Sequence, residues 1–567
     1  MYITIHIECF YLTSIKSSHL PFEGFKPNHL VLDYVTLSSR YRVGMHIYLQ
    51  CKNTQATHTK IMAETHIFFI SILLLASFIY LFKLLKHQNG KNLPPSPPSI
   101  PIIGHLHLMN GHIHRVLQNL SSKYGPVMAL RFGFRPVLII SSPSAAEECF
   151  TKNDIVLANR PLLVTGKYLD YDHSTVGVAP YGQLWRDLRR VMTLELFSTA
   201  RLKSYLGVRE DEVRSLIKNL YKDCFQDFTK VEMRSRIQAL SFNVVMKVVA
   251  DKQFYGTGME DNAEAAKFKD VMRDVFEIIG TPNPGDFFPF LRWIDFQGFE
   301  KRLVKLQKKT DSFSQNLIEE IRAKRSSSSS EKGNDKTFID ALLTLQESQP
   351  DYYTDNIIKG NISTLLQAGT DTSSVTIEWA MALLLNHPNV LERARAELDN
   401  YIGQERLVQE TDLTNLPYIQ CIISETLRLF PSAPLLVPHE SSQDCIIGGF
   451  NVTLGTMVFV NAWAIHRDPI VWNDPLSFKP ERFEKVGNEG YRFIPFGMGR
   501  RQCPGSGLAN RVVGLALASL IQCFEWERVG EELVDLSEGK GLTMPKDEPL
   551  EAMCRARQKM SHFIKDL

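Results

Sequence analysis

The stretch RFIPFGMGRRQCPGSG, Arg492 to Gly507, decides the fold, because turn-forming residues surround a single cysteine. Glycine and proline interrupt regular structure, so we expect a shaped loop here. Three of its glycines are expected to allow close backbone approach and positive φ: Gly497, Gly499 and Gly505. Backbone N–H groups and the cation of Arg501 would favour the thiolate of Cys503, the form that binds a metal. The alternative is a small buried hydrophobe, the usual state of a lone cysteine.

The stretch LANRVVGLALASLIQCF, residues 508–524, follows the loop as an apolar helical pattern. The positive end of such a helix would point at the cysteine sulfur. The loop also completes a spaced pattern, F-x-x-G-x-R-x-C-x-G, formed by Phe496, Gly499, Arg501, Cys503 and Gly505.

The composition of the 567 residues is that of an ordinary globular protein, with 44% hydrophobic and 22% charged residues. A net charge of +2 indicates neither a nucleic-acid-binding protein nor an acidic solvating chain. The nine cysteines are scattered, and no C-x-x-C or H-E-x-x-H motif occurs. This distribution favours a reducing compartment over a disulfide framework or a structural zinc site.

One segment predicts a membrane anchor. IFFISILLLASFIYLFKLL, Ile67 to Leu85, has no acidic residue and spans roughly 28 Å as a helix, close to the thickness of the hydrocarbon layer. Glu64 precedes the segment, and lysines end and follow it. This asymmetry favours an uncleaved anchor with a cytosolic C-terminal side over a cleaved signal peptide.

The rest of the chain predicts one large domain that is mainly α with small β-sheets. Two strands are expected around Gly133, helices dominate residues 145–428, and strands return in residues 433–460. A long helix is expected from Asp355 to Asn386, ended by Pro388, and a low-complexity loop at residues 322–336. The expected organisation is a non-native or disordered extension (1–61), an anchor (62–92), a proline-rich hinge (93–104) and a catalytic domain (105–567).

The long helix contains LLQAGTDTSSVTIEWAM, in which Gly369 and several hydroxyl residues are poor helix formers. Thr and Ser hydroxyls in a helix bond back to the i−4 carbonyl and bend the axis. One interpretation is a kink packed in the core. The other is a short proton path made by Asp371 and Thr372.

Together these motifs resemble the cytochrome P450 family. The loop resembles its haem–thiolate signature, and Ala368–Ser373 matches its [A/G]-G-x-[D/E]-T-[T/S] element. The resemblance implies haem b with Cys503 as the axial iron ligand. It also implies that Asp371 and Thr372 supply protons at the oxygen site, and it places the following residues around the haem: Ala368, Gly369, Phe496, Arg501 and Gly505.

Two further motifs match the family. SETLRLFP and FKPERF carry Glu425, Arg428 and Arg482, which the resemblance implies form a structural ion-pair network. WRDLRR carries Trp185 and Arg189, one helical turn apart, which are implied to bind a haem propionate. Arg501 and His439 stand where the family often has further propionate partners.

The resemblance implies an NADPH- and O2-dependent monooxygenase. No dinucleotide-binding fingerprint is evident, so NADPH is expected to act through a partner, NADPH–cytochrome P450 reductase. Basic residues that include Arg186, Arg190 and Arg500 are expected either to steer an acidic reductase or to be ordinary solvated charges. The expected location is the endoplasmic reticulum membrane, with a single-pass anchor and a cytosolic catalytic domain. The alternatives are a reductase-independent isomerase or lyase, and a non-catalytic haem protein.

The substrate class is the broadest expectation. APLLVPHESS and DLTNLPYIQCIISETLRL resemble the plant A-type group that contains isoflavone hydroxylases and relatives acting on lignans and indole glucosinolates. We expect a hydrophobic specialised metabolite: a flavonoid, isoflavonoid or other phenolic, a lignan, an indole or a terpenoid. The segments expected to line its pocket are 162–174, 365–367, 435–437 and 542–544.

Overall fold

The computed structural model describes residues 45, 52, 60, 62–78, 92–255, 271, 273–327, 337–485, 487 and 489–567. The chain divides into an N-terminal unit, Met1–Asn89, and a main unit, Gly90–Leu567. The described helix of the N-terminal unit runs from Met62 to Phe78, and apolar side chains such as Phe68 and Leu73 are exposed along it. Residues 79–91 of the expected anchor, and nearly all of the expected extension 1–61, lie outside the described residues.

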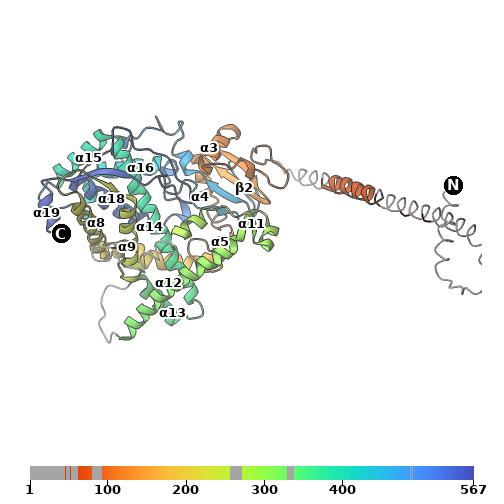
Figure 1. Cartoon of the computed structure of the whole chain (residues 1–567), viewed down its shortest axis with the longest axis horizontal. Helices are drawn as coiled ribbons and strands as arrows, with labels where there is room; N and C mark the ends of the chain where they lie inside the picture. Colours follow the sequence, from red (N-terminus) through yellow and green to blue (C-terminus); the bar gives the residue numbers. More distant parts are fainter. Residues whose placement is uncertain are drawn as a thin grey trace, which may run out of the picture. The chain divides into compact units, whose positions relative to one another are not determined.

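The main unit is mainly helical, as predicted (Figure 1). Its α-helices are α3 (Ile113–Tyr124), α4 (Pro143–Phe150), α5 (Val164–Leu169), α6 (Gln183–Met192), α7 (Thr199–Ser204), α8 (Leu206–Cys224), α9 (Arg234–Ala250), α11 (Pro284–Phe287), α12 (Phe299–Ser327), α13 (Phe338–Ser348), α14 (Asp355–Asn386), α15 (Pro388–Tyr401), α16 (Pro417–Leu429), α17 (Ala462–Ile465), α18 (Ser506–Cys523) and α19 (Ser561–Lys565).

The described residues of the main unit also form three small sheets. The largest has the order β1-β2-β7-β4, in which only the β2–β7 pair is parallel. The strands are β1 (Val127–Phe132), β2 (Arg135–Ile140), β3 (Thr229–Glu232), β4 (His439–Glu440), β5 (Cys445–Ile447), β6 (Phe450–Val452), β7 (Met457–Val460), β8 (Phe524–Glu527) and β9 (Glu551–Ala556). The two strands predicted around Gly133 are β1 and β2, which form an antiparallel hairpin.

Helix α14 is the central element, and its second half is almost entirely buried. It begins at the cap Thr354 and ends at Asn386, and Pro388 opens α15, as the sequence predicts. In Figure 1, α8, α9 and α18 lie to one side of α14, and α4 and β2 lie to the other. Helix α18, residues 506–523, is the one described helix long and apolar enough to cross a membrane, but 67% of it is buried in the main unit. It is therefore a core helix.

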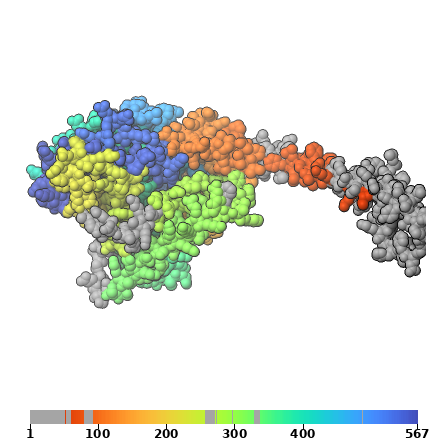
Figure 2. Space-filling model, in the orientation of Figure 1, coloured from red at the N-terminus to blue at the C-terminus, as the bar shows by residue number. Residues whose placement is uncertain are grey.

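Two expected loops are more ordered than the composition predicts. The start of the low-complexity stretch, up to Ser327, completes α12, where Arg322 pairs with Asp355 at 2.7 Å; residues 328–336 lie outside the described residues. The proline-rich segment is attached to the main unit: Pro95 accepts from Ala129 N at 2.8 Å. The space-filling view shows the surface of residues 92–140 (orange) adjoining that of α11–α12 (green) (Figure 2).

Candidate active site

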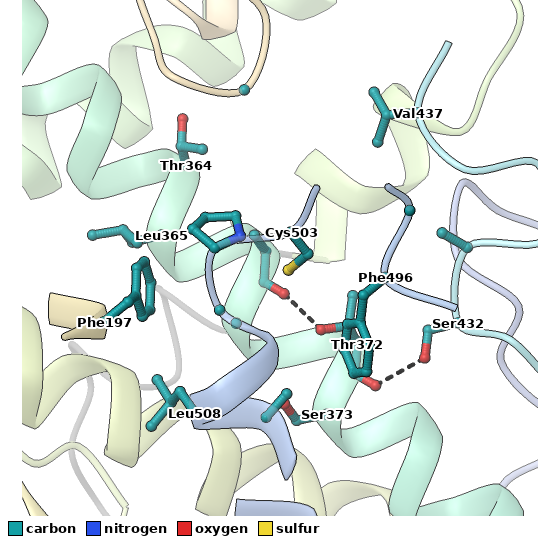
Figure 3. A pocket seen from close by; sticks show the side chains of 18 of the residues that line it. Phe197, Thr364, Leu365, Thr372, Ser373, Ser432, Val437, Phe496, Cys503 and Leu508 are labelled. Carbon is teal, nitrogen blue, oxygen red and sulfur yellow. Dashed lines mark hydrogen bonds between the residues drawn. The ribbon is translucent and has the colours of Figure 1, made fainter. Parts of the chain in front are cut away.

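A cavity of about 350 Å³ lies in the main unit between α6, α9, α14 and the loop before α18. Its wall is mostly apolar, and its size is within the range of small-molecule sites. Figure 3 shows the side chain of Cys503 among the lining residues, with Thr372 and Phe496 on one side and Leu365 and Phe197 on the other. Residues far apart in the sequence therefore meet around one sulfur atom.

The loop that carries Cys503 has the shape that its glycines permit. Gly497 and Gly499 have φ of 66° and 69°, and a Cβ on Gly499 would lie 2.4 Å from Asp154 Oδ1. The N–H of Cys503 donates to Phe496 O at 2.9 Å and closes the loop. Gly505 differs from the expectation of positive φ: its φ is −85°, because it is the N-cap of α18.

The Cys503 thiol is open to the cavity while protein encloses it elsewhere. Burial raises the pKa of this thiol, against the opposing effects of the Gly505 and Ser506 N–H groups and of Arg189. Arg189 is the cation that opposes this rise in pKa, whereas Arg501 donates to the backbone carbonyls of Ala158 and Ala179. Replacement of the thiol proton by a metal ion is what makes the thiolate the stable form.

Helix α14 presents hydroxyl groups to the cavity. Thr372 lines it and donates to Ala368 O at 2.7 Å, the predicted back-bond, and α14 stays helical through this segment (Figure 3). Ala368 and Gly369 line the same wall. A Cβ on Gly369 would lie 2.7 Å from Val245 Cγ2, so glycine is required for α14 to pack this closely on α9.

Asp371 does not lie where the expected acid–hydroxyl pair would put it. It is absent from the cavity wall, and its Oδ2 accepts a 2.5 Å hydrogen bond from Thr543 Oγ1. Burial raises the pKa of Asp371, and the Thr543 hydrogen bond and the more distant Arg234 lower it in part. Asp371 thus precedes Thr372 in the sequence, but its carboxyl group points to Thr543 and not into the cavity.

Positive side chains gather at the cavity. Arg160, Arg189 and Arg501 all line it, and none pairs with a carboxylate of the described residues. Burial lowers the pKa of Arg160 and of Arg501 to about 9. Trp185 stacks under Arg501, whose guanidinium carbon is 4.5 Å from the ring centroid. His439 also lines the cavity, and burial lowers its pKa well below the usual value, so it is neutral.

These residues fit haem. The Nε of Arg160 is buried without a partner, and three guanidinium groups without carboxylate partners suit the two propionates of that macrocycle. The cavity would supply one thiol to hold the iron and apolar side chains to pack against the ring. Arg160 was not predicted from the sequence, because an Arg-Pro pair in a connecting segment resembles an ordinary turn.

The ion-pair network lies outside the cavity. Arg428 Nε is 2.6 Å from Glu425 Oε2, and Arg482 Nε is 3.2 Å from Glu425 Oε1. Arg428 also donates to the carbonyls of His466 and Pro475, both at 2.7 Å. The network therefore joins α16 to the segments before the cysteine loop.

Two of the expected pocket segments do not reach the cavity. Residues 162–174 and 542–544 are absent from its wall, whereas Leu365, Leu436 and Val437 line it as expected. In their place, α9 and the segment after α6 contribute apolar side chains: Val244, Val245, Val248, Val249, Leu196 and Phe197. The valine-rich sequence of α9 predicts a buried core helix. Sequence alone did not identify these residues as a cavity wall, because a core helix has the same pattern.

Comparison with known proteins agrees with this geometry. The family model described as Cytochrome P450 matches residues 94–550. The chain is 52% identical to isoflavone 3'-hydroxylase of Medicago truncatula, over 86% of this chain and 98% of that protein. It is 51% identical to (+)-piperitol/(+)-sesamin synthase CYP81Q2 of Sesamum radiatum, over 89% and 99%. A zebra fish cytochrome P450 structure with progesterone superposes with a TM-score of 0.68 at 27% identity, over 79% of this chain and 100% of that one.

Proposed function

This chain belongs to the cytochrome P450 family, and from that premise we propose that it is an NADPH- and O2-dependent haem-thiolate monooxygenase that hydroxylates a hydrophobic plant specialised metabolite. The overall reaction is RH + O2 + NADPH + H⁺ → ROH + H2O + NADP⁺. The observation that carries the proposal is the cavity in which the Cys503 thiol and the Thr372 hydroxyl meet three guanidinium groups that have no carboxylate partner among the described residues.

Cys503 would hold the haem iron, and Arg160, Arg189 and Arg501 would bind the propionates. Haem bound in this way supplies the oxygen-activating chemistry. The loop positions the sulfur, because the Cys503 N–H is fixed to Phe496 O and α18 begins directly after the cysteine. The apolar wall from α9 excludes water and favours a hydrophobic substrate.

Thr372 and Asp371 would supply protons. The Thr372 hydroxyl lies at the cavity wall and donates a hydrogen bond to Ala368 O. Its oxygen is free to accept a hydrogen bond from a second donor. Asp371 is the adjacent acid, and burial raises its pKa, so it holds a proton to higher pH than an exposed carboxyl. Each turnover leaves the carboxyl to be reprotonated from solvent.

Two relatives support a hydrophobic specialised metabolite as the substrate, since one is named isoflavone 3'-hydroxylase and the other (+)-piperitol/(+)-sesamin synthase. The apolar α9 side chains and the few hydroxyl groups that line the cavity are compatible with a substrate of fused or linked aromatic rings. Flavonoids, other phenolics, indoles and terpenoids share this apolar character, so they belong in the same screen.

NADPH–cytochrome P450 reductase would deliver the electrons. A surface groove on α6 adjoins the cavity wall, with which it shares Trp185 and Arg189. It is also lined by Arg186, Arg190 and Leu194. We expect reversal of the charges of Arg186 and Arg190 to slow reduction of the haem and weaken its salt dependence. An unchanged rate and salt dependence would exclude these arginines from the docking site.

Residues 62–92 would anchor the enzyme in the endoplasmic reticulum membrane, residues 93–104 would form the hinge and residues 105–567 the cytosolic catalytic domain. The apolar helix Met62–Phe78 supports the anchor. Expression of residues 62–567 and of 92–567, followed by separation of membrane and soluble fractions, tests it. Recovery of the longer chain in the soluble fraction after centrifugation would contradict it.

The test of the activity is turnover of residues 62–567 co-expressed with a plant reductase in microsomes. Flavonoids, isoflavonoids, lignans, indoles and terpenoids are screened under ¹⁸O2 for a product that gains one labelled oxygen atom. The proposal requires that the product depend on both NADPH and reductase. A product formed without either would indicate an isomerase or lyase.

A further inference from the structure

The carboxyl group of Asp371 is bound by a residue from the far C-terminal part of the main unit. Thr543, 172 residues later in the chain, donates its hydroxyl to Asp371 Oδ2 at 2.5 Å. No cation forms an ion pair with Asp371 among the described residues, and the nearby Arg234 pairs with Glu378 at 3.1 Å. The Thr543 hydroxyl is therefore the group that fixes where this carboxyl points.

The position of Thr543 is fixed by hydrogen bonds of the residue that follows it. The next residue, Met544, donates its N–H to Ser432 O at 3.0 Å and accepts from Trp379 Nε1 at 2.8 Å. Ser432 Oγ in turn donates to Thr372 O at 3.1 Å (Figure 3). The hydrogen bonds thus run from Asp371 through the 543–544 turn and Ser432 back to the residue after Asp371, so the turn cannot shift without disturbing the helix.

We propose that Thr543 is a positioning residue for proton supply, which fixes the direction of the Asp371 carboxyl outside the cavity wall. The proposal rests on the proposed function, in which Asp371 and Thr372 carry protons. Thr543 donates and so favours the carboxylate that remains after Asp371 has given up its proton. Asp371 passes that proton to the Thr372 hydroxyl, which passes one on into the cavity, and solvent restores the proton to the carboxylate.

The same arrangement explains why the 542–544 segment is absent from the cavity wall. Met544 is buried in the core and Thr543 faces α14, so this turn acts on the site through Asp371 and not by contact with the substrate. Substitutions at Thr543 should accordingly change the use of protons more than the binding of substrates.

The test compares Thr543→Val, which removes the hydroxyl at nearly constant shape, with Thr543→Ser, which keeps it. The holoenzyme and reductase turn over without added substrate, and NADPH, O2 and H2O2 are measured in the same run. Two reactions compete: O2 + NADPH + H⁺ → H2O2 + NADP⁺, and O2 + 2 NADPH + 2 H⁺ → 2 H2O + 2 NADP⁺. Because only the second reaction breaks the O–O bond, the ratio of water to peroxide reports proton supply.

We expect Thr543→Val to lower the water-to-peroxide ratio by roughly tenfold. We also expect it to move the alkaline limb of that ratio to higher pH, since loss of a hydrogen bond to the charged form raises a carboxyl pKa. Thr543→Ser should resemble the wild type in both. A second readout is independent of turnover: carbodiimide coupling of glycine ethyl ester to Asp371, read by peptide mass spectrometry, should increase in Thr543→Val and not in Thr543→Ser.

Asp371→Asn distinguishes a failure of proton supply by Asp371 from a failure of the positioning role of Thr543. If it leaves the water-to-peroxide ratio unchanged, Asp371 supplies no proton and the proposed function of this residue fails. If it lowers the ratio while Thr543→Val matches the wild type in ratio, pH limb and labelling, the role of Thr543 is refuted. Should Thr543→Val fail to fold, Thr543→Ala removes the same hydroxyl with less bulk and is subject to the same two outcomes.

Discussion

The Glu425 carboxylate and the Arg428 guanidinium form an ion pair one helical turn apart on α16, with 2.6 Å between Oε2 and Nε and neither side chain exposed to solvent. Ionised groups without water are stable only when they are paired and hydrogen-bonded. Both conditions are met, since the Lys479 N–H donates to Glu425 Oε1 at 2.9 Å and Arg428 donates to three backbone carbonyls.

Removing one member of this pair should cost much more than removing an exposed pair. Arg428→Met leaves a buried carboxylate partly unpaired and should lower the free energy of unfolding by about 3–5 kcal/mol. Lys230→Gln is the control: its pair with Glu551, 3.1 Å long, is half exposed and worth under about 1 kcal/mol. Urea unfolding measures both, and equal costs would contradict the structural role of Arg428.

Arg189 should retain the haem. Its guanidinium lines the cavity without a carboxylate partner among the described residues, so Arg189→Ala removes a charge-assisted hydrogen bond to a propionate. We expect about tenfold faster transfer of haem to apomyoglobin, measured by absorbance. Arg186→Ala on the same helix is the control, because the exposed Arg186 side chain hydrogen-bonds to Gln183 of α6 and does not line the cavity. Equal rates for the two variants would remove Arg189 from the haem site.

The main unit should lose stability in acid because the Glu538 carboxylate becomes protonated. Burial opposes ionisation of this carboxyl, but hydrogen bonds from His114 and Arg115 outweigh it and lower the pKa from 4.5 to about 2. A carboxyl with a depressed pKa in the folded state stabilises fully above its unfolded pKa, and this contribution is lost as the pH falls from about 4.5 towards 2.

Urea unfolding of the wild type and of Glu538→Gln over a pH series measures this contribution. The two stabilities should differ by about 3 kcal/mol at neutral pH and converge as the pH falls from about 4.5 to about 2. The burial of His114 lowers its pKa as well, so the wild type should also lose stability below about pH 6.5 when this imidazole has to be charged. A constant difference between wild type and variant throughout the series would show that Glu538 does not titrate as described.

Local geometry explains what the sequence predicts well. A loop with glycines at φ of 66° and 69°, a helix closed by Pro388 and an ion pair at i,i+3 all depend on a few neighbouring residues. The fold class follows from the same local patterns, because apolar periodicity sets the type of each element.

The sequence does not predict the direction in which a side chain points or which distant segments meet. Asp371 and Thr372 are adjacent in sequence, yet only tertiary packing decides that one carboxyl meets Thr543 and one hydroxyl lines the cavity. Arg501 was expected to affect the sulfur, but carbonyl groups that no local pattern reveals accept its hydrogen bonds. The valines of α9 and the isolated Arg160 reach the site in the same way, through contacts between distant segments.

The absorbance spectrum of the reduced carbonyl complex in Cys503→Ser decides whether Cys503 holds the iron. The wild type should give the thiolate-type spectrum, and so should Cys445→Ser, a control at a half-buried cysteine outside the cavity. Cys503→Ser should lose it, because serine offers no thiolate to the iron. Survival of the thiolate-type spectrum in Cys503→Ser would contradict the assignment of the iron ligand, and with it the proposed site.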